Sequence, residues 1–218
     1  MPLLSKQDAA ASFPIDTTTP FHPTKAIYIN DPSEFSLTTT ATDITTSVAH
    51  LLPSLDVQTT PTLLTTAKST SPTLPVTLTF TRPNRLSRSW TASEPDSNTP
   101  IAELSNPLWS LGKWTITFPS PSSHSSHTII LHPASFASKT DEFVKDSVPY
   151  FWDMVEGRKL CKLYRAMEGK KVEVARFVGE NVRAREGVLL VEDGKGVDWV
   201  VVMVTFLAVL MRVDSFRA

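Results

Sequence analysis

The sequence contains a single cysteine, Cys161, and seven glycines among 218 residues. One cysteine excludes an intrachain disulfide and a cysteine-rich zinc site, and such sparing use of cysteine is typical of a reducing compartment. Few glycines leave little material for phosphate-cradling loops. The sequence has no Gly-x-Gly-x-x-Gly, P-loop or Gly-x-Ser-x-Gly pattern, so the usual signatures of nucleotide binding and serine hydrolysis are excluded.

Signals for secretion and for nucleic-acid binding are missing as well. The N-terminal stretch MPLLSKQDAAASF lacks a basic region followed by an apolar core, so we expect no secretory signal. The formal net charge of -1 argues against a nucleic-acid partner. We therefore expect a cytoplasmic protein, with peripheral attachment to a membrane as the alternative.

The histidines do not form a recognisable metal site. His124, His127 and His132 lie close together in the sequence, but no carboxylate accompanies them, and a metal site needs further ligands. In a strand, residues five apart such as His127 and His132 point to opposite faces. We predict no metal site and no cofactor.

One long apolar run is present, at residues 199–211 (WVVVMVTFLAVLM). It is shorter than the roughly 20 residues of a membrane-spanning helix, and it lacks the polar positions of an amphipathic surface helix. Asp198 is placed to cap the N-terminus of a helix, and Arg212 sits at its negative C-terminal end. We therefore predict a helix buried on all sides, because the run exceeds the usual length of a strand.

Short segments with alternating apolar and polar residues predict strands through most of the chain. They lie at residues 76–80, 86–92, 101–104, 114–118, 128–132, 148–154, 160–167, 172–178 and 187–192. The turn Glu168-Gly169-Lys170-Lys171 predicts a hairpin. An antiparallel sheet, sandwich or barrel fits this spacing. A closed barrel around the helix would hide the whole helix surface and remove the sheet edges, so we predict a mainly β fold of this kind.

The chain divides by composition near residue 70. Residues 1–70 are rich in Thr and Pro and predict a loosely packed, partly ordered extension. Within it, residues 26–29 favour a strand, and residues 47–52 favour a short helix or strand. A phosphorylation-prone or partner-binding arm is the functional alternative for this segment. Residues 71–218 are predicted to form the barrel domain.

A family resemblance follows from the order of several segments. These are LTFTRP, SRSWTASEP, HTIILHPAS, SVPYFWDM, KLYRAMEGKKVEVARFVGE and VTFLAVLMRVDSF. Together they resemble the fungal branch of the tubby C-terminal-like domains, a superfamily that includes tubby-like, LURP-one-related and phospholipid scramblase proteins. The resemblance covers about residues 72–218 and is most specific at Tyr164-Arg165, Ala175-Arg176-Phe177 and Asp214-Ser215-Phe216.

The resemblance implies a fold and only loosely a function. The implied fold is an antiparallel barrel of about a dozen strands around a central hydrophobic C-terminal helix. Tubby members bind phosphoinositides through surface Lys and Arg, which implies an anionic-lipid partner without assigning positions here. Scramblase members carry a cysteine-rich palmitoylated stretch, which the lone Cys161 does not supply, so scramblase activity is not implied.

Residues 158–185 form the most basic stretch, with nine Lys and Arg against three Glu. The candidate ligand-binding residues are Arg158, Lys159, Lys162, Arg165, Lys170 and Lys171. Such a hairpin is suited to an anionic headgroup, at about 1 kcal/mol per basic residue near an anionic membrane. The alternative is a solvated hairpin whose charges protect the strands from edge pairing.

Three classes of function remain open, the third being a structural or interaction protein that acts through the Thr-rich segment. The leading hypothesis is a non-enzymatic binding module for anionic lipid headgroups or a protein partner. The rival is a small-molecule enzyme, an isomerase or cyclase with a pocket on the barrel flank. Trp90, Trp109, Trp114 and Trp152 are candidates to line such a pocket, but large aromatics are more typical of a core. Cys161 is predicted to face the interior as a small hydrophobic residue.

Overall fold

A computed structural model describes residues 13–31, 36–54, 59–95, 97, 99–107, 112–135, 138–181, 184–193 and 197–215. In this part of the chain twelve strands form one closed barrel. They are β1 (Lys25–Asn30), β2 (Thr38–Asp43), β3 (Leu78–Thr81), β4 (Ser89–Ser93), β5 (Pro100–Ser105), β6 (Trp114–Thr117), β7 (Ile129–Pro133), β8 (Thr140–Lys145), β9 (Val148–Arg158), β10 (Leu160–Met167), β11 (Lys170–Gly179) and β12 (Gly187–Val191).

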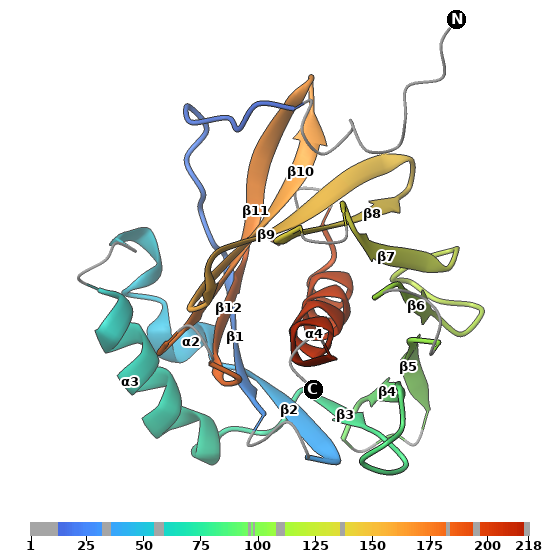
Figure 1. Ribbon diagram of the computed structural model, residues 1–218. Coiled ribbons are helices and arrows are strands. Elements are labelled where there is room, and N and C mark those ends of the chain that lie inside the picture. The colour runs from blue at the N-terminus through green and yellow to red at the C-terminus, as the bar shows by residue number, and fades with distance from the viewer. Residues whose placement is uncertain are drawn as a thin grey trace, which may run out of the picture.

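The barrel is an antiparallel meander, because each strand pairs with the next one in the sequence (Figure 1). The first strand closes it: β1 lies between β2 and β12, with Lys25 opposite Val191 and Ile27 opposite Asp43. Closure removes the two free edges that an open sheet of this size would present. The predicted fold class, a mainly β closed antiparallel barrel, is confirmed.

The apolar run forms α4 (Trp199–Ser215), which lies inside the barrel (Figure 1). Its side chains from Val200 to Arg212 are all buried, and Leu207 and Leu210 are 0% and 2% exposed, as the sequence predicts. Asp198 caps it, because its Oδ1 accepts a hydrogen bond from the Val200 amide at 2.8 Å. No helix in the described part of the chain has the length and apolar character needed to cross a membrane.

Within the described residues, two hydrophobic clusters hold the fold together. Inward side chains of the strands pack on α4, and Trp90, Trp114, Trp152 and Cys161 all belong to this interior cluster. A second cluster lies outside the barrel, where α2 (Thr45–Val48) and α3 (Thr60–Thr70) cover the outer faces of β1 and β12. Because β12 is buried on both faces, it is apolar throughout its length. Short 3-10 turns at Leu52–Ser54 and Ser71–Thr73 flank α3.

The barrel begins at β1, so the predicted boundary at residue 71 does not coincide with its start. Both β1 and β2, together with α2 and α3, come from the segment predicted to be a loosely packed extension. Residues 26–29 lie within β1, as predicted. The Thr-rich composition is misleading because Thr is β-branched and suits strands, and Thr39 and Ala41 of β2 are fully buried.

Candidate functional site

The candidate basic residues of the β10–β11 hairpin are dispersed rather than gathered on one surface. Lys162 and Arg176 both bind one carboxylate, Glu173, at 2.9 Å and 2.6 Å. Lys159 pairs with Glu156 at 3.3 Å, and both side chains are about half exposed. These cations are at least partly neutralised by neighbours within the same sheet.

The remaining candidates have different surroundings. Lys171 is buried, with its Nζ 4.6 Å from the centre of the Phe151 ring. Lys170 is exposed on the turn, and Arg165 is half-buried on β10, opposite Tyr150 of β9. Arg158 ends β9, but its side chain lies outside the described part of the structure, as do Arg183 and Trp109.

Residues 13–21, here called the N-terminal strap, cross the outer face of this hairpin. Pro14 O accepts a hydrogen bond from the Lys171 amide at 2.8 Å, and the Asp16 amide donates to Lys171 O at 2.9 Å. The Phe13 and Phe151 ring centroids are 6.1 Å apart. At the other end of the strap, the Arg176 guanidinium lies 5.1 Å from the Phe21 ring. The strap therefore covers part of the surface that the sequence indicates for ligand binding.

The barrel interior is occupied by the protein's own side chains. Trp152 Nε1 donates to the Thr205 hydroxyl at 3.1 Å, which satisfies the indole donor inside the core. The Thr205 hydroxyl also lies 2.9 Å from Val201 O and 3.0 Å from Val202 O. The single hydroxyl of the apolar run is thus used within the core, and the helix fills the space in which a substrate would have to bind.

An ion pair lies at the C-terminal end of α4. Asp141 of β8 is fully buried, and Arg212 approaches it through Nε and through Nη2, each at 2.7 Å. Burial raises the pKa of the Asp141 carboxyl to about 6, although the Arg212 charge acts in the opposite direction. This pair fixes the end of the helix to the barrel wall.

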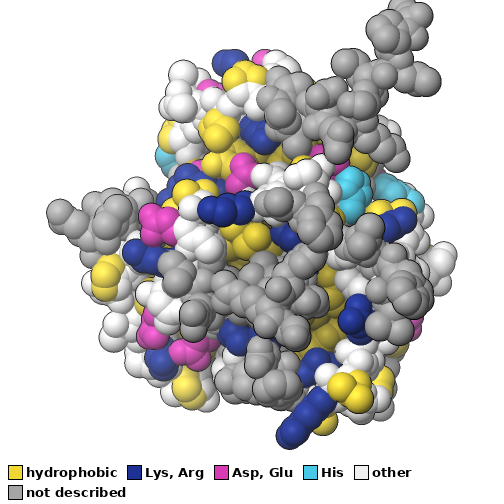
Figure 2. All heavy atoms as spheres, viewed as in Figure 1, with side chains coloured by type: hydrophobic (Ala, Val, Ile, Leu, Met, Phe, Trp, Pro, Cys, Tyr) yellow, Lys and Arg dark blue, Asp and Glu magenta, His cyan; other side chains and the backbone are white. Residues whose placement is uncertain are grey.

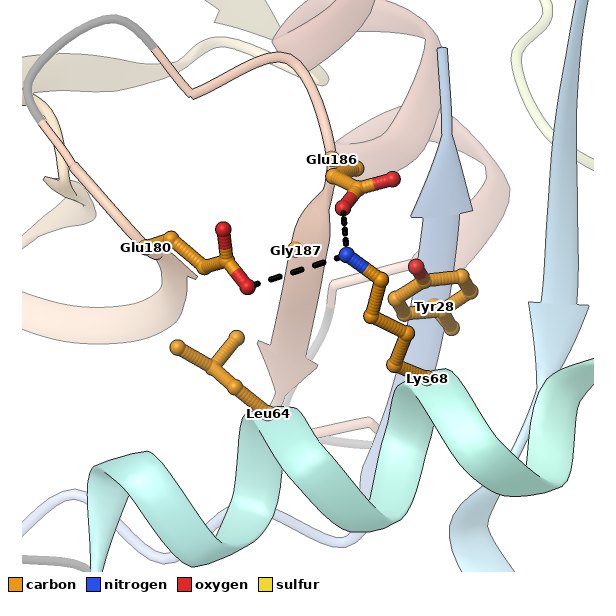
Figure 3. Close-up of a pocket in the computed structure, with 6 residues that line it drawn as sticks. All are labelled: Tyr28, Leu64, Lys68, Glu180, Glu186 and Gly187. Carbon is orange, nitrogen blue, oxygen red and sulfur yellow. Dashed lines mark hydrogen bonds and ion pairs between the residues drawn. The ribbon is translucent and has the colours of Figure 1, made fainter. Parts of the chain in front are cut away.

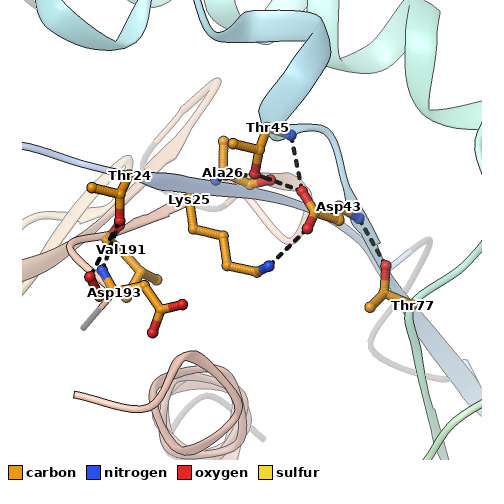
Figure 4. Close-up of polar contacts among 8 residues, drawn as sticks. All are labelled: Thr24, Lys25, Ala26, Asp43, Thr45, Thr77, Val191 and Asp193. Atoms are coloured by element: carbon orange, nitrogen blue, oxygen red, sulfur yellow. Dashed lines mark hydrogen bonds and ion pairs between the residues drawn. The ribbon is translucent and has the colours of Figure 1, made fainter. Parts of the chain in front are cut away.

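A second ion pair stands at the other end of α4. Lys25 Nζ lies 2.8 Å from Asp43 Oδ2 (Figure 4). The same Nζ lies 4.8 Å from the centre of the Trp199 ring. Partial burial opposes ionisation of Asp43, but hydrogen bonds from Lys25 and Thr45 outweigh it and lower the pKa of the carboxyl. Asp43 Oδ1 also accepts a hydrogen bond from the Thr45 hydroxyl at 2.6 Å. These contacts join β1, β2 and α2 to the start of the helix.

A shallow pocket lies between α3 and the barrel wall (Figure 3). It is lined by Tyr28, Leu64, Lys68, Glu180, Glu186 and Gly187, and it has room for about one water molecule. Lys68 Nζ binds Glu186 at 2.7 Å and approaches Glu180 at 3.8 Å. Burial raises the pKa of Tyr28, and the Glu186 carboxylate raises it further. The pocket is too small for an organic substrate, and its charged groups attach α3 to the barrel.

The histidines lie in separate pairs. His124 Nδ1 is 2.7 Å from Asp198 Oδ2, so this histidine supports the residue that caps α4. His132 lies 3.6 Å from Glu142, and His127 lies 3.9 Å from Asp146. Among the described residues, no group of three or more His, Cys, Asp or Glu side chains is placed to hold a metal ion.

The loop between β3 and β4, residues 82–88, carries an exposed apolar side chain between arginines. We call it the arginine loop. Leu86 is 92% exposed and is flanked by Arg85 and Arg88, which are also exposed. No acidic residue occurs from residue 78 to residue 93. Figure 2 shows Lys and Arg side chains beside hydrophobic ones at the lower edge of the molecule, where β2 begins and β3 ends.

The arginine loop has a defined shape. Asn84 Oδ1 accepts the Leu86 amide at 3.0 Å, and Asn84 O accepts the Ser87 amide at 3.1 Å. Arg82 lies over the Trp90 ring at 4.9 Å and donates through Nε to Ser36 O at 2.8 Å. These contacts hold the base of the loop to its neighbours and leave Leu86 at the tip.

The charge around Arg82 is locally positive. Burial lowers the pKa of the Arg82 guanidinium, and Arg185 and Arg85 lower it further, while Asp31 acts in the opposite direction. Beside it, Leu37 is 43% exposed, and its carbonyl accepts the Arg82 amide at 3.0 Å. Exposed leucines and arginines therefore share one end of the barrel.

The sequence predicts a turn at the start of this loop, as the structure has, but residues 86–92 alternate and were predicted as a single strand, so the exposed tip at Leu86 was missed. In the structure β4 starts only at Ser89, so Leu86 belongs to the turn instead of the sheet. The turn signal Arg82-Pro83-Asn84-Arg85 was visible in the sequence, and three arginines within seven residues were the signal for a basic tip.

Comparison of the chain with protein-family models, with curated proteins and with solved structures found no match. We therefore assign function from the geometry of the described residues.

Proposed function

We propose that this protein is a non-enzymatic binding module that docks on anionic membrane surfaces through the arginine loop. The observation that carries the proposal is Leu86, 92% exposed between Arg85 and Arg88 in a segment without acidic residues. An apolar tip with flanking cations suits the boundary between lipid headgroups and acyl chains, where the leucine loses contact with water and the arginines meet phosphate oxygens.

The energetics suit a weak and reversible attachment. Each arginine near an anionic surface contributes about 1 kcal/mol, and burying a leucine side chain contributes about 2 kcal/mol. Arg85, Arg88 and Leu86 together supply about 4 kcal/mol, which corresponds to a dissociation constant on the order of 1 mM in accessible lipid. The loop alone supports peripheral docking, and a second contact would be needed for stable anchoring.

Two further observations favour a binding module over an isomerase or cyclase. The interior of the barrel is filled by α4, and the pocket beside α3 has room for about one water molecule. On the β10–β11 hairpin, Lys162 and Arg176 share the Glu173 carboxylate, which reduces the positive potential there. We also propose membership of the tubby C-terminal-like superfamily, which is supported by the barrel of twelve strands around a C-terminal helix.

Vesicle co-sedimentation tests the function. The wild-type protein should pellet with vesicles containing phosphatidylserine and remain in the supernatant with pure phosphatidylcholine. Arg85→Glu and Arg88→Glu should each lower the partition coefficient by roughly fivefold or more. Equal, negligible pelleting with both vesicle types would refute the proposal.

A charge reversal at the opposite end of the barrel separates the two basic surfaces. Lys170→Glu should leave pelleting at the wild-type level if the arginine loop is the docking surface. If Lys170→Glu releases the protein and Arg85→Glu does not, docking occurs at the hairpin, and the arginine loop is the wrong surface.

A further inference from the structure

The outer edge of β11 extends beyond its neighbour. The register between β11 and β12 ends at Ala175 opposite Val191, and the Glu192 amide still donates to Val174 O at 3.0 Å, so residues 170–173 run on without β12 beside them. In the closed barrel this overhang is an exposed piece of strand edge, which is the usual site for the addition of an extended segment.

The N-terminal strap occupies this edge. Ile15 forms a parallel bridge with Lys171, and the amide and carbonyl of Lys171 bond to Pro14 O and to the Asp16 amide. The strap crosses at the tip of the β10–β11 hairpin, at the opposite end of the barrel from the arginine loop (Figure 1).

The side chains of the strap show which chemistry the edge accepts. Phe151 points away from the barrel interior, because its neighbours Tyr150 and Trp152 belong to the interior cluster, yet it is 1% exposed. Phe13 packs against it on one side and Lys171 lies over its ring. Three residues after Phe13, hydrogen bonds from Thr18 and Thr19 lower the pKa of the Asp16 carboxyl, and the charge of Lys170 adds a smaller lowering. The edge therefore takes an aromatic side chain followed by an acidic one.

The hold of the strap on the edge is small. Among the described residues, two backbone hydrogen bonds and the Phe13–Phe151 ring contact hold the strap at this edge, and Arg176 lies over the Phe21 ring at its other end. Ile15, between them, is 51% exposed. Asp16 binds the hydroxyls of Thr18 and Thr19 within the strap itself. Segments with so few contacts open locally at low free energy.

We infer that the overhanging edge of β11 is a docking site for an extended segment of a partner protein, which displaces the strap. The segment has an aromatic residue followed three positions later by a carboxylate, as Phe13 and Asp16 are spaced here. Its backbone pairs with Lys171, its ring packs against Phe151, and its carboxylate is attracted by the charge of Lys170. This interaction goes beyond membrane docking and uses a different end of the barrel.

The experiment uses a labelled peptide of residues 11–20 (ASFPIDTTTP) as the probe, and fluorescence anisotropy as the measurement. The full-length double variant Phe13→Ala, Asp16→Pro lacks the ring and the amide donor that hold its own strap. The peptide should bind this variant at least tenfold more tightly than the wild-type protein, whose strap competes for the edge. The same peptide with Phe13→Ala should bind the variant at least tenfold more weakly than the native peptide.

Three outcomes would overturn the inference. They are absence of binding to both proteins, equal affinity for both, and equal affinity of the native and Phe13→Ala peptides. A wild-type dimer that dissociates in the double variant would also overturn it, because the occupant would then be the strap of a second copy. None of these outcomes bears on vesicle binding through the arginine loop, so the two proposals fail separately.

Discussion

Arg212 ends the apolar run and yet is 3% exposed, because Asp141 receives its guanidinium inside the barrel. The sequence indicates the role of Arg212 at the end of a helix, since a cation follows thirteen uncharged residues. It does not indicate Asp141, because the two adjacent acidic residues in TDEFVK match a turn or a solvent-exposed strand as well as a core position. Single residues whose partners are distant in sequence are therefore the hardest to predict.

The raised pKa of Asp141 makes stability depend on pH with a definite sign. The folded-state pKa of this carboxyl is about 6, above the ordinary value of 3.8. Its contribution to the free energy of unfolding is therefore present at low pH. It is lost as the pH rises through about 6. Urea unfolding at several pH values tests this. The wild-type protein should gain about 1–2 kcal/mol in free energy of unfolding relative to Asp141→Asn when the pH is lowered from 7 to 5. Parallel pH profiles for the two proteins would contradict this assignment.

Strands whose apolar residues alternate regularly are the elements that the sequence predicts best. The β10–β11 hairpin is an example, because Glu168 and Gly169 both have positive φ, as a tight two-residue turn requires. β2 and β8 were missed because their inward positions include Thr39 and Asp141, which break the apolar pattern. α3 was missed because six of its eleven residues are Thr or Ser, and only Leu63 and Ala67 are buried.

At the scale of an element, the enclosure of α4 is tested by placing a charge on it. Leu207→Asp places a carboxylate without a partner among apolar side chains, at a cost of several kcal/mol, against a total stability of about 5–15 kcal/mol for a domain. The variant should be unfolded or insoluble by circular dichroism and gel filtration. Lys170→Asp, on the exposed hairpin turn, should fold as the wild type does. A folded Leu207→Asp protein would contradict enclosure of the helix.

β12 supplies a test of close packing. A Cβ added at Gly187 would lie 2.3 Å from Val178 O and 2.7 Å from the Phe177 ring, and the carbonyl belongs to a paired strand that cannot move away. Gly187→Ala should therefore lower the free energy of unfolding by about 1–3 kcal/mol. A Cβ added at Gly169 would meet nothing within 4 Å, and the substitution would strain only the turn, where this residue has φ of 75°. Gly169→Ala should therefore lower the free energy of unfolding by nearer 1 kcal/mol. Chemical denaturation measures the free energy of unfolding of both variants. Equal losses in the two variants would argue against close packing at Gly187.

For the whole molecule, closure around the apolar helix is predictable, and the distribution of surface charge is not. A segment buried on all sides needs an enclosure, and the alternating strands provide it. The basic stretch at residues 158–185 appears continuous in sequence, but pairing with Glu156 and Glu173 and cover by the strap divide it in three dimensions. The arginine loop has three arginines within seven residues of the sequence, but the exposure of Leu86 depends on where β4 begins, which the alternation of residues 86–92 conceals.

The most direct measurement places an environment-sensitive fluorophore at the tip of the arginine loop. Cys161 is buried, so a nitrobenzoxadiazole label attaches to an introduced cysteine in Leu86→Cys or, at the opposite end of the barrel, in Met167→Cys. With phosphatidylserine vesicles, the label at position 86 should shift to shorter wavelength and gain intensity, while the label at position 167 stays unchanged. A shift at position 167 alone, or at neither position while the protein pellets, would contradict docking through the arginine loop.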